Sequence, residues 1–387
     1  MTPTSAAPST EPVLATPAAT PQRLISLDAF RGLTMALMVL VNNNGSERDA
    51  YLQLRHSQWH GWTITDTVFP SFLWIVGVAI TLSLGKRVAE GIPRARLLPQ
   101  IFKRAVILFV LGLAVYAFPH FNPATQRILG VLQRIAICYL VTAVLFLYTG
   151  LRGQIAWLIG LLAAYWMLMT LVPVPGFGPG RLDVEGNFAH YVDRMALGSH
   201  NYEFPKTWDP EGIVSTLPAI ATTLFGVLAG RLLRLRRSLP ERMTWLFLAG
   251  NLLLAAGAIC SYWLPINKKL WTDSFCLFMA GLDFVVFAMF AWLVDGLGWH
   301  KPVRPLAILG MNAIAVYMVS EGAAEALWNI RWNSAAGPVS LQRYLYHTLF
   351  APLASPANAS LLYSLAFTAA MFLVAYGMYR KGWFLRV

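Results

Sequence analysis

The sequence has little charge: only 12% of its 387 residues are Asp, Glu, Lys or Arg, against about 25% in an average soluble protein. Long apolar runs take the place of charge, since 57% of the residues are hydrophobic and the mean hydropathy is +0.55. This shortage excludes an ordinary soluble domain and predicts an integral membrane protein with many spans. The net charge is nevertheless +12, and the Lys and Arg residues occur in short clusters between the apolar runs. Such clusters fix membrane topology, so they do not predict nucleic-acid binding.

Cysteine is scarce, and motifs that hold disulfides or bind nucleotides are missing. The three cysteines, Cys138, Cys260 and Cys276, each lie in an apolar run, with no CxxC pair. This excludes a disulfide framework and predicts small buried thiols. Neither GxGxxG nor GxxxxGK occurs, which argues against a nucleotide-hydrolysing pump. Residues 1–22 have no basic start and no apolar core, so they predict a disordered cytoplasmic tail and not a signal peptide.

Apolar runs long enough to cross a bilayer, which takes about 20 residues, recur ten times along the chain. The predicted spans are 27–43, 64–84, 103–119, 128–148, 154–173, 213–232, 243–264, 271–295, 303–321 and 358–379. Helices are expected because a sheet edge exposed to lipid leaves backbone groups unpaired. An amphipathic stretch at 338–353 predicts an interfacial or re-entrant helix and is not counted. The predicted fold class is an all-α integral membrane protein with about ten transmembrane helices.

Basic residues predict which ends of the spans face the cytoplasm. The loops 85–104 and 231–242 and the C-terminal end are rich in Lys and Arg, and ten spans place all three on one side. By the positive-inside rule this side is cytoplasmic, together with both termini. The opposite side receives the loop 43–63 and the long loop 174–212, which has six acidic and three basic residues. A periplasmic loop at 174–212 is therefore predicted.

A dense polar stretch, LRHSQWHGWTITDTVFP at residues 54–70, lies on that opposite side at the start of the second predicted span. His56 and His60 are spaced like a metal-binding pair with Asp66 as a third ligand, although nothing in the sequence makes this segment helical. The alternatives are a structural histidine and a catalytic base, because an imidazole titrates near neutral pH. Asp66 itself is typical of a first helical turn, where a carboxylate interacts with the helix dipole. The residues alone leave these interpretations open.

Several polar side chains lie inside or beside apolar runs, where they are costly and usually face the interior of a bundle. Arg134, in GVLQRIAICYL, predicts a buried partner that is either a carboxylate or an anionic ligand. Lys268, in LPINKKLWT, lies on the outer side against the positive-inside pattern. Asn42, the first of three consecutive asparagines, either ends its helix or donates to a developing oxyanion. Asn312 and Glu321 complete this set.

Seven motifs occur in order along residues 23–387: RLISLDAFRGLTMALMVLVNNNG, RHSQWHGWTITDTVFPSFLWIVGVAI, GVLQRIAICYL, YVDRMALG, WDPEGIVSTLPAI, PINKKLWT and GMNAIAVY. This series resembles the transmembrane domain of the heparan-α-glucosaminide N-acetyltransferase family and its bacterial homologues. The resemblance implies that residues 23–387 form one multi-span acyltransferase domain. In that family an acetyl group passes from cytosolic acetyl-CoA to a glucosamine amine across the membrane. Family members are often dimers, so a homodimer is also implied.

The resemblance implies roles for individual residues. His56, in HSQWHG, matches the active histidine of the family. Asn42 matches an asparagine implicated in catalysis, and Asp66 matches the aspartate of a TxxDxxFP-like sequence. His60 matches no catalytic residue. The expected roles are base or acetyl acceptor for His56, stabilisation of the tetrahedral state for Asn42, and orientation of the histidine for Asp66.

The predicted function is therefore that of an enzyme, a transmembrane acyltransferase. It would move an acetyl group from cytoplasmic acetyl-CoA, its co-substrate, to an amino sugar or glycan at the outer face of a bacterial inner membrane. The expected partners are this acceptor and membrane lipid, with neither a metal nor nucleic acid. An amino-sugar transporter is the alternative, because the same polar residues can line a translocation path.

The remaining predicted contacts are of two kinds, those with acetyl-CoA and those with the acceptor. Candidates for the phosphates of acetyl-CoA, on the electropositive side, are Arg104, Arg134 and Arg234. Candidates for the acceptor are Trp59, Trp62, Lys268, Asn312 and Glu321. For the two tryptophans, an aromatic belt at the membrane interface is the alternative.

Overall fold

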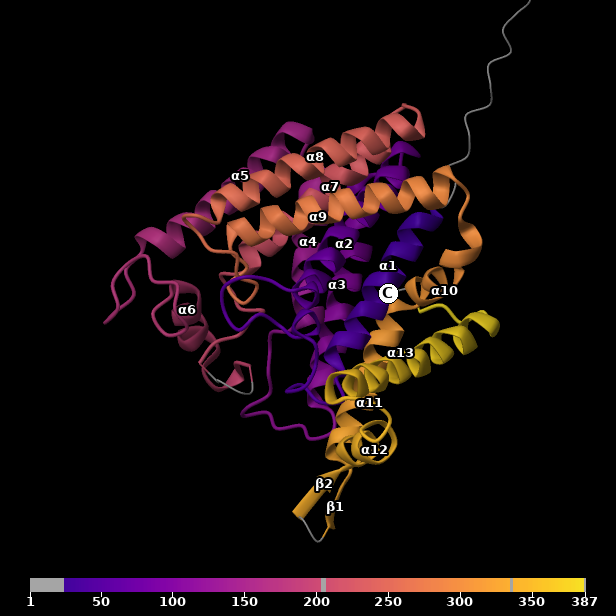
Figure 1. Cartoon of the computed structure of the whole chain (residues 1–387). Helices are drawn as coiled ribbons and strands as arrows, with labels where there is room; N and C mark the ends of the chain where they lie inside the picture. Colours follow the sequence, from indigo (N-terminus) through magenta and orange to yellow (C-terminus); the bar gives the residue numbers. More distant parts are fainter. Residues whose placement is uncertain (1–23, 203–206, 335–336, 386–387) are drawn as a thin grey trace, which may run out of the picture.

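The computed structural model describes residues 24–202, 207–334 and 337–385, and it consists almost entirely of helices (Figure 1). The predicted tail at 1–22 lies outside the described residues. Within the described residues, nine helices are long and apolar enough to cross a membrane. They are α1 (Ile25–Asn42), α2 (Ile64–Ala89), α3 (Arg94–Ala117), α4 (Val131–Tyr148), α5 (Leu151–Leu171), α7 (Thr216–Leu233), α8 (Leu239–Cys260), α9 (Asp273–Ala291, continued by a π-helical turn at Trp292–Gly296) and α13 (Pro356–Arg380). The predicted all-α integral membrane class is confirmed.

The predicted ninth span, 303–321, differs from the expectation because it is broken. Two helices replace it, α10 (His300–Met311) and α11 (Ala313–Asn329). They meet at 71°, and counting them as one span gives ten spans in the described part of the chain. Asn312 lies at the break, where its Nδ2 donates to the Trp383 carbonyl at 3.1 Å and its Oδ1 accepts from the Leu385 amide at 3.1 Å. This side chain ties the C-terminal segment to the bend.

Short elements lie in the connections between the long helices. They are α6 (Phe188–Leu197), the strands β1 (Arg331–Ser334) and β2 (Gly337–Ser340), α12 (Leu341–Leu345), a π-helical turn at Tyr346–Phe350 and 3-10 turns at Leu52–Leu54 and Gly198–His200. The strands pair antiparallel with Arg331 opposite Ser340, and Figure 1 shows this hairpin projecting beyond α11 and α12. The amphipathic stretch 338–353 is thus most of a strand followed by a short helix and a turn, and not one helix.

The buried centre of the bundle is built on α2 and α7. In each of these spans 78% of the apolar window is buried, against 22% in α3, α5, α8 and α13, whose outer faces are left for lipid. Two glycines let α2 and α7 approach closely: a Cβ on Gly77 would lie 1.9 Å from the Thr223 carbonyl oxygen, and one on Gly226 would lie 2.0 Å from that of Trp74. Small residues at such contacts are typical of membrane helix pairs, because they allow backbones to approach.

Successive spans alternate in direction, so the basic helix ends gather at one end of the bundle. Arg94 begins α3, Arg234 follows α7 and Arg380 ends α13, and these residues define what we call the basic side. The opposite end, which we call the site side, holds the loop 43–63, α6 and the β-hairpin. That the basic side faces the cytoplasm stays a prediction.

Candidate active site

A cavity of about 530 Å³ opens on the site side, where the ends of α1, α2 and α11 meet the loops that precede α2, α7 and α9. We call it the His56 cavity. Five of the side chains predicted from the sequence line it: Asn42, His56, Asp66, Lys268 and Glu321. The fold therefore brings together the three predicted catalytic residues and two of the predicted acceptor contacts.

His56 and Asp66 are held against each other by the start of α2. The His56 Nδ1 lies 2.7 Å from the Asp66 Oδ1. The other oxygen, Oδ2, accepts from the Thr63 and Ser57 amides, both at 3.1 Å. Thr63 and Asp66 form the capping box of the helix, and this folds the loop back onto its first turn. Because a carboxylate only accepts hydrogen bonds, Nδ1 carries the ring proton and Nε2 keeps its lone pair.

Lys268 completes a charged group around the imidazole. Its Nζ lies 3.2 Å from Nδ1 and 3.4 Å from Nε2 of His56, and 3.9 Å from the Asp66 Oδ1. Burial and the Lys268 charge lower the pKa of His56, and together they outweigh the opposite effect of Asp66. Burial also lowers the pKa of Lys268 itself. His56 is therefore a neutral imidazole at neutral pH, the form that can accept a proton or act as a nucleophile.

The two histidines of the polar stretch have different surroundings. His60 Nδ1 lies 3.4 Å from the Asn267 Nδ2, and its ring stacks edge-on with Trp59 at 6.2 Å. Within the described residues, no group of three His, Cys, Asp or Glu side chains is arranged to hold a metal ion. The structure thus separates His56, beside the cavity, from its neighbour four residues later.

The three consecutive asparagines at the end of α1 have different hydrogen-bond partners. Asn43 Nδ2 donates to the Val39 carbonyl at 2.8 Å, and Asn44 Nδ2 donates to the Val41 carbonyl at 3.2 Å, so both close the helix. Asn42 instead exposes its amide to the His56 cavity and hydrogen-bonds the Glu321 carboxylate. An amide has two N–H donors, so Asn42 can hold Glu321 with one and offer the other to a ligand.

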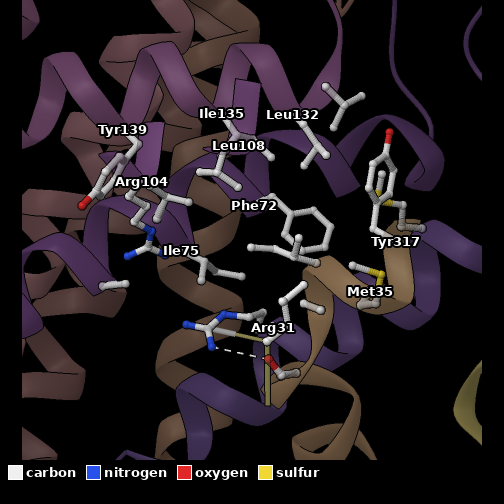
Figure 2. Close-up of a pocket in the computed structure, with 18 of the residues that line it drawn as sticks. Arg31, Met35, Phe72, Ile75, Arg104, Leu108, Leu132, Ile135, Tyr139 and Tyr317 are labelled. Atoms are coloured by element: carbon white, nitrogen blue, oxygen red, sulfur yellow. Dashed lines mark hydrogen bonds between the residues drawn. The ribbon is translucent and has the colours of Figure 1, made fainter. Parts of the chain in front are cut away.

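A second, largely apolar cavity of about 350 Å³ lies deeper in the bundle, between α1, α2, α3, α4 and α11 (Figure 2). We call it the inner cavity. It shares the side chains of Met38, Val131 and Tyr317 with the His56 cavity. Arg31 and Arg104 line it nearer the basic side, because Arg31 precedes Met38 along α1 by nearly two turns and Arg104 lies in the first half of α3. The two cavities adjoin and span much of the bundle.

The two arginines of the inner cavity differ in how they are paired. Arg31 Nη1 contacts the Asp28 Oδ1 at 3.2 Å and the Gly310 carbonyl at 3.5 Å. The Arg104 guanidinium lies 4.8 Å from the Tyr139 ring centre, and its buried Nε has no hydrogen-bond partner in the described part of the chain. In Figure 2 both arginines lie on one side of the cavity and Tyr317 on the other. A cation with unused donors is suited to an anionic ligand.

Arg134 lies elsewhere, at the site-side start of α4. Its Nη2 donates to the Gly212 carbonyl at 3.0 Å and to the Ser215 hydroxyl at 2.5 Å, and its guanidinium lies 5.2 Å from the Trp271 ring centre. The residue lines neither cavity. These bonds hold it against the start of α7, while its buried Nε and Nη1 have no hydrogen-bond partner among the described residues. Its contact with a phosphate of acetyl-CoA stays a prediction.

Arg234 also lies away from the inner cavity, at the basic end of α7. It donates to the carbonyls of Thr81 and Gly85, both at 3.2 Å. With Arg94 and Arg231 it lines a separate cavity of about 420 Å³. Its contact with acetyl-CoA stays a prediction. Such a contact would involve the parts of acetyl-CoA that project beyond the inner cavity.

The predicted acceptor tryptophans pack against other parts of the protein. Trp59 Nε1 donates to the Leu182 carbonyl at 2.9 Å, and its ring meets Trp208 edge-on at 6.0 Å. Trp62 packs on Phe278 at 5.2 Å. Neither side chain lines the His56 cavity, whereas Trp208 does. Asn312 does not line this cavity either, and its side chain holds the C-terminal segment at the α10–α11 bend.

Comparison with known protein sequences places this chain in a family. The family model described as "Heparan-alpha-glucosaminide N-acetyltransferase, catalytic" matches residues 23–263. The chain belongs to this family. Curated relatives named heparan-alpha-glucosaminide N-acetyltransferase include a Homo sapiens protein, 30% identical over 427 aligned positions and 95% of this chain, and a Mus musculus protein, 29% identical over 420 positions and 94% of this chain. The alignments cover 60% of each relative, so the chain spans about 60% of their length.

Family membership confirms the resemblance read from the seven motifs. The matched region includes Asn42, His56 and Asp66, which line the His56 cavity. Lys268 and Glu321 lie beyond the matched region. They were singled out because polar groups are costly at such positions, and the fold places both at the same cavity.

The sequence predictions missed an ion-pair cluster that covers one wall of the His56 cavity. Arg127 Nη2 contacts the Asp209 Oδ1 at 2.6 Å and the Glu211 Oε2 at 2.5 Å. The guanidinium stacks between the rings of Tyr116 and Tyr202, at 4.8 and 4.7 Å. Burial acts to raise the pKa of Glu211, but the charge of Arg127 lowers it overall. The signal for this cluster in the sequence was WDPEG, which places two acidic residues shortly before the apolar run of α7.

Proposed function

We propose that this protein is a transmembrane acetyltransferase. It takes an acetyl group from acetyl-CoA on the basic side and delivers it to the amine of an amino sugar or glycan on the site side. The observation that supports this most is the shared wall of the inner cavity and the His56 cavity, formed by Met38, Val131 and Tyr317. A donor that enters from one side and an acceptor from the other can meet where these cavities join.

The inner cavity suits the acyl-carrying arm of acetyl-CoA. That arm is long and narrow, with methyl and methylene groups beside its two amides and its hydroxyl, and apolar side chains such as Phe72, Leu132 and Ile135 line the cavity. Arg104 and Arg31 lie toward the basic side, where the anionic nucleotide would remain. With the thioester at Met38 and Tyr317, its carbonyl would be delivered to the cavity that His56 lines.

His56 supplies the chemistry through Nε2. In direct transfer this nitrogen takes a proton from the acceptor amine while the amine nitrogen attacks the thioester carbonyl carbon. Collapse of the tetrahedral state breaks the C–S bond, and the proton on Nε2 passes to the departing thiolate. In covalent transfer Nε2 attacks the thioester carbonyl carbon and CoA leaves as its thiolate. The acceptor amine then attacks the acetyl group on the imidazolium, the bond to Nε2 breaks, and the proton lost by the amine passes to Nε2 and from there to the thiolate. Both routes need the neutral tautomer that Asp66 fixes.

Asn42 and Lys268 support the same step. The Asn42 amide opens on the cavity and has a donor to spare for the carbonyl oxygen as it becomes an oxyanion. Lys268 keeps the imidazole neutral by lowering the pKa of His56 together with burial. Glu321, held by Asn42, lines the wall nearest α11 and would accept a hydrogen bond from an acceptor amine or hydroxyl.

We place the protein in a bacterial inner membrane, with the basic side in the cytoplasm. The positive-inside pattern supports this sidedness, and cytoplasmic acetyl-CoA would then reach the inner cavity directly. The predicted homodimer stays part of this proposal.

The test is turnover of acetyl-CoA by purified protein with glucosamine as acceptor. His56→Ala should abolish release of CoA while acetyl-CoA still binds, because His56 lines the site-side cavity and not the inner one. His60→Ala is the matched control, four residues away and bonded to Asn267, and it should retain turnover. Undiminished activity in His56→Ala would refute the assigned role. Sugar movement into sealed vesicles without CoA release would instead establish a transporter.

A further inference from the structure

A third cavity adjoins the His56 cavity on the site side, and nothing in the proposed transfer uses it. Its volume is about 670 Å³, and the two cavities share Asn42, Asn44, Glu47 and Glu325. We call it the outer cleft. The outer cleft therefore opens from the wall of the His56 cavity to which Asn42 belongs. Both volumes fall within the range of about 300–1,000 Å³ typical of small-molecule sites.

Aromatic rings and hydrogen-bonding groups line the outer cleft together. Tyr346 and Tyr363 are buried, with ring centres 6.3 Å apart, and Trp328 is 54% exposed. Gln342 Nε2 donates to the Gly45 carbonyl at 3.0 Å, which fixes the amide at the rim. Flat apolar faces beside fixed polar groups match a sugar ring, which has an apolar face and a polar edge.

Trp328 is held in place before any ligand arrives. The Arg331 guanidinium lies 5.0 Å from its ring centre, and Arg331 Nε donates to the Trp328 carbonyl at 3.0 Å. An exposed aromatic ring that is already positioned loses little freedom on binding, so its contact adds directly to affinity. Figure 1 shows the end of α11, which carries Trp328, beside α12 and the hairpin.

The charges of the outer cleft disfavour a polyanion, with one titratable histidine, His347, among the lining residues. Three carboxylates line it, Glu47, Asp49 and Glu325, against the two guanidiniums of Arg48 and Arg343. Recognition of sulfate or phosphate groups depends on an excess of Arg and Lys. This balance fits an uncharged sugar or one with a free ammonium group.

We propose that the outer cleft binds the second sugar residue of an unsulfated oligosaccharide acceptor, whose terminal amine reaches His56. The inference rests on the proposed function, because it names the acceptor class of the same site. The natural acceptor is then at least a disaccharide. Its first ring occupies the His56 cavity and its second ring stacks on Trp328.

The test compares glucosamine with a β-1,4-linked glucosamine disaccharide, using the full chain in detergent at saturating acetyl-CoA. The KM for the disaccharide should be about tenfold lower, which corresponds to about 1.4 kcal/mol. Trp328→Ala should bring the ratio of the two KM values to about one. Trp332→Ala is the matched control, because that exposed tryptophan lies on β1, packs on Tyr344 and lines neither cavity. It should keep the tenfold ratio.

Equilibrium binding of both sugars in the absence of acetyl-CoA separates this inference from the proposed function. If no sugar is acetylated, yet the disaccharide binds about tenfold more tightly than glucosamine and Trp328→Ala removes the difference, the transfer is refuted and the outer cleft stands. Equal binding of the two sugars, or a preference that survives Trp328→Ala, overturns the inference whether or not transfer occurs. Tighter binding of a sulfated disaccharide than of the unsulfated one also overturns it.

Discussion

Replacement of Asp66 by asparagine tests the arrangement around His56 most sharply, because the change is almost isosteric. Asp66 uses one oxygen, Oδ1, for His56 and the other, Oδ2, for donors from Ser57 and Thr63. In Asp66→Asn the amide oxygen can replace Oδ2 and keep all of those donors. The NH₂ group must then face the His56 Nδ1.

In this variant the hydrogen bond at the His56 Nδ1 must reverse its direction. An NH₂ group cannot accept the proton of Nδ1, so His56 adopts the other tautomer, in which Nδ1 accepts and Nε2 carries the proton. Nε2 then has no lone pair for the amine or the acetyl group. The equivalent change in a serine-protease triad lowers kcat about 10⁴-fold. We expect a loss of about 10²–10⁴-fold in kcat, or about 3–5 kcal/mol of activation free energy.

The assay measures release of the CoA thiol with glucosamine, together with acetyl-CoA binding and thermal unfolding. Asp66→Asn should leave acetyl-CoA binding unchanged and shift unfolding little, because the capping box survives. Asp273→Asn is the matched control, a buried aspartate at the start of α9 that lines neither the inner cavity nor the His56 cavity. If kcat of Asp66→Asn stays within about threefold of the unmodified protein, the reasoning from tautomer to activity is wrong.

Two further predictions concern the electrostatics of the site and the path of the donor. The Lys268 charge, after burial, lowers the pKa of His56; Lys268→Gln should therefore raise that pKa and move the acid limb of the kcat/KM profile to higher pH. A limb that stays in place would contradict the assigned role of Lys268. Ile135→Trp should fill the inner cavity and lower turnover of acetyl-CoA at least tenfold, whereas Leu252→Trp, on the exposed face of α8, should not. Equal activity of the two tryptophan variants would exclude the inner cavity as the donor path.

Most of the fold could be predicted from the sequence, because lipid imposes a simple length and hydropathy requirement on each span. The exceptions are the stretch 338–353, which is a strand, a short helix and a turn in place of one helix, and the break at Asn312. Hydropathy averages over a window and reads residues 303–321 as one run, while the bend depends on bonds from Asn312 to Trp383 and Leu385. Partners 71 and 73 residues away leave no local pattern.

The residues of the candidate site could likewise be predicted only in part. Lys268 and Glu321 could be singled out because a polar group beside an apolar run is costly and needs a reason. Arg127 could not, since its partners Asp209 and Glu211 lie more than 80 residues away on a loop whose course is set by tertiary contacts. The roles expected for His56, Asn42 and Asp66 came from motif resemblance, and the structure adds how they lie relative to one another.

The most direct test of the account places the two substrates on opposite sides of a membrane. The protein is reconstituted into sealed vesicles with acetyl-CoA in one compartment and glucosamine in the other, in both arrangements, with His56→Ala as the inactive control. If the protein passes the acetyl group across the membrane, N-acetylated sugar should appear in the compartment that held glucosamine and free CoA in the compartment that held acetyl-CoA. Product that forms only when both substrates share a compartment, or unmodified sugar that crosses the membrane, would contradict it.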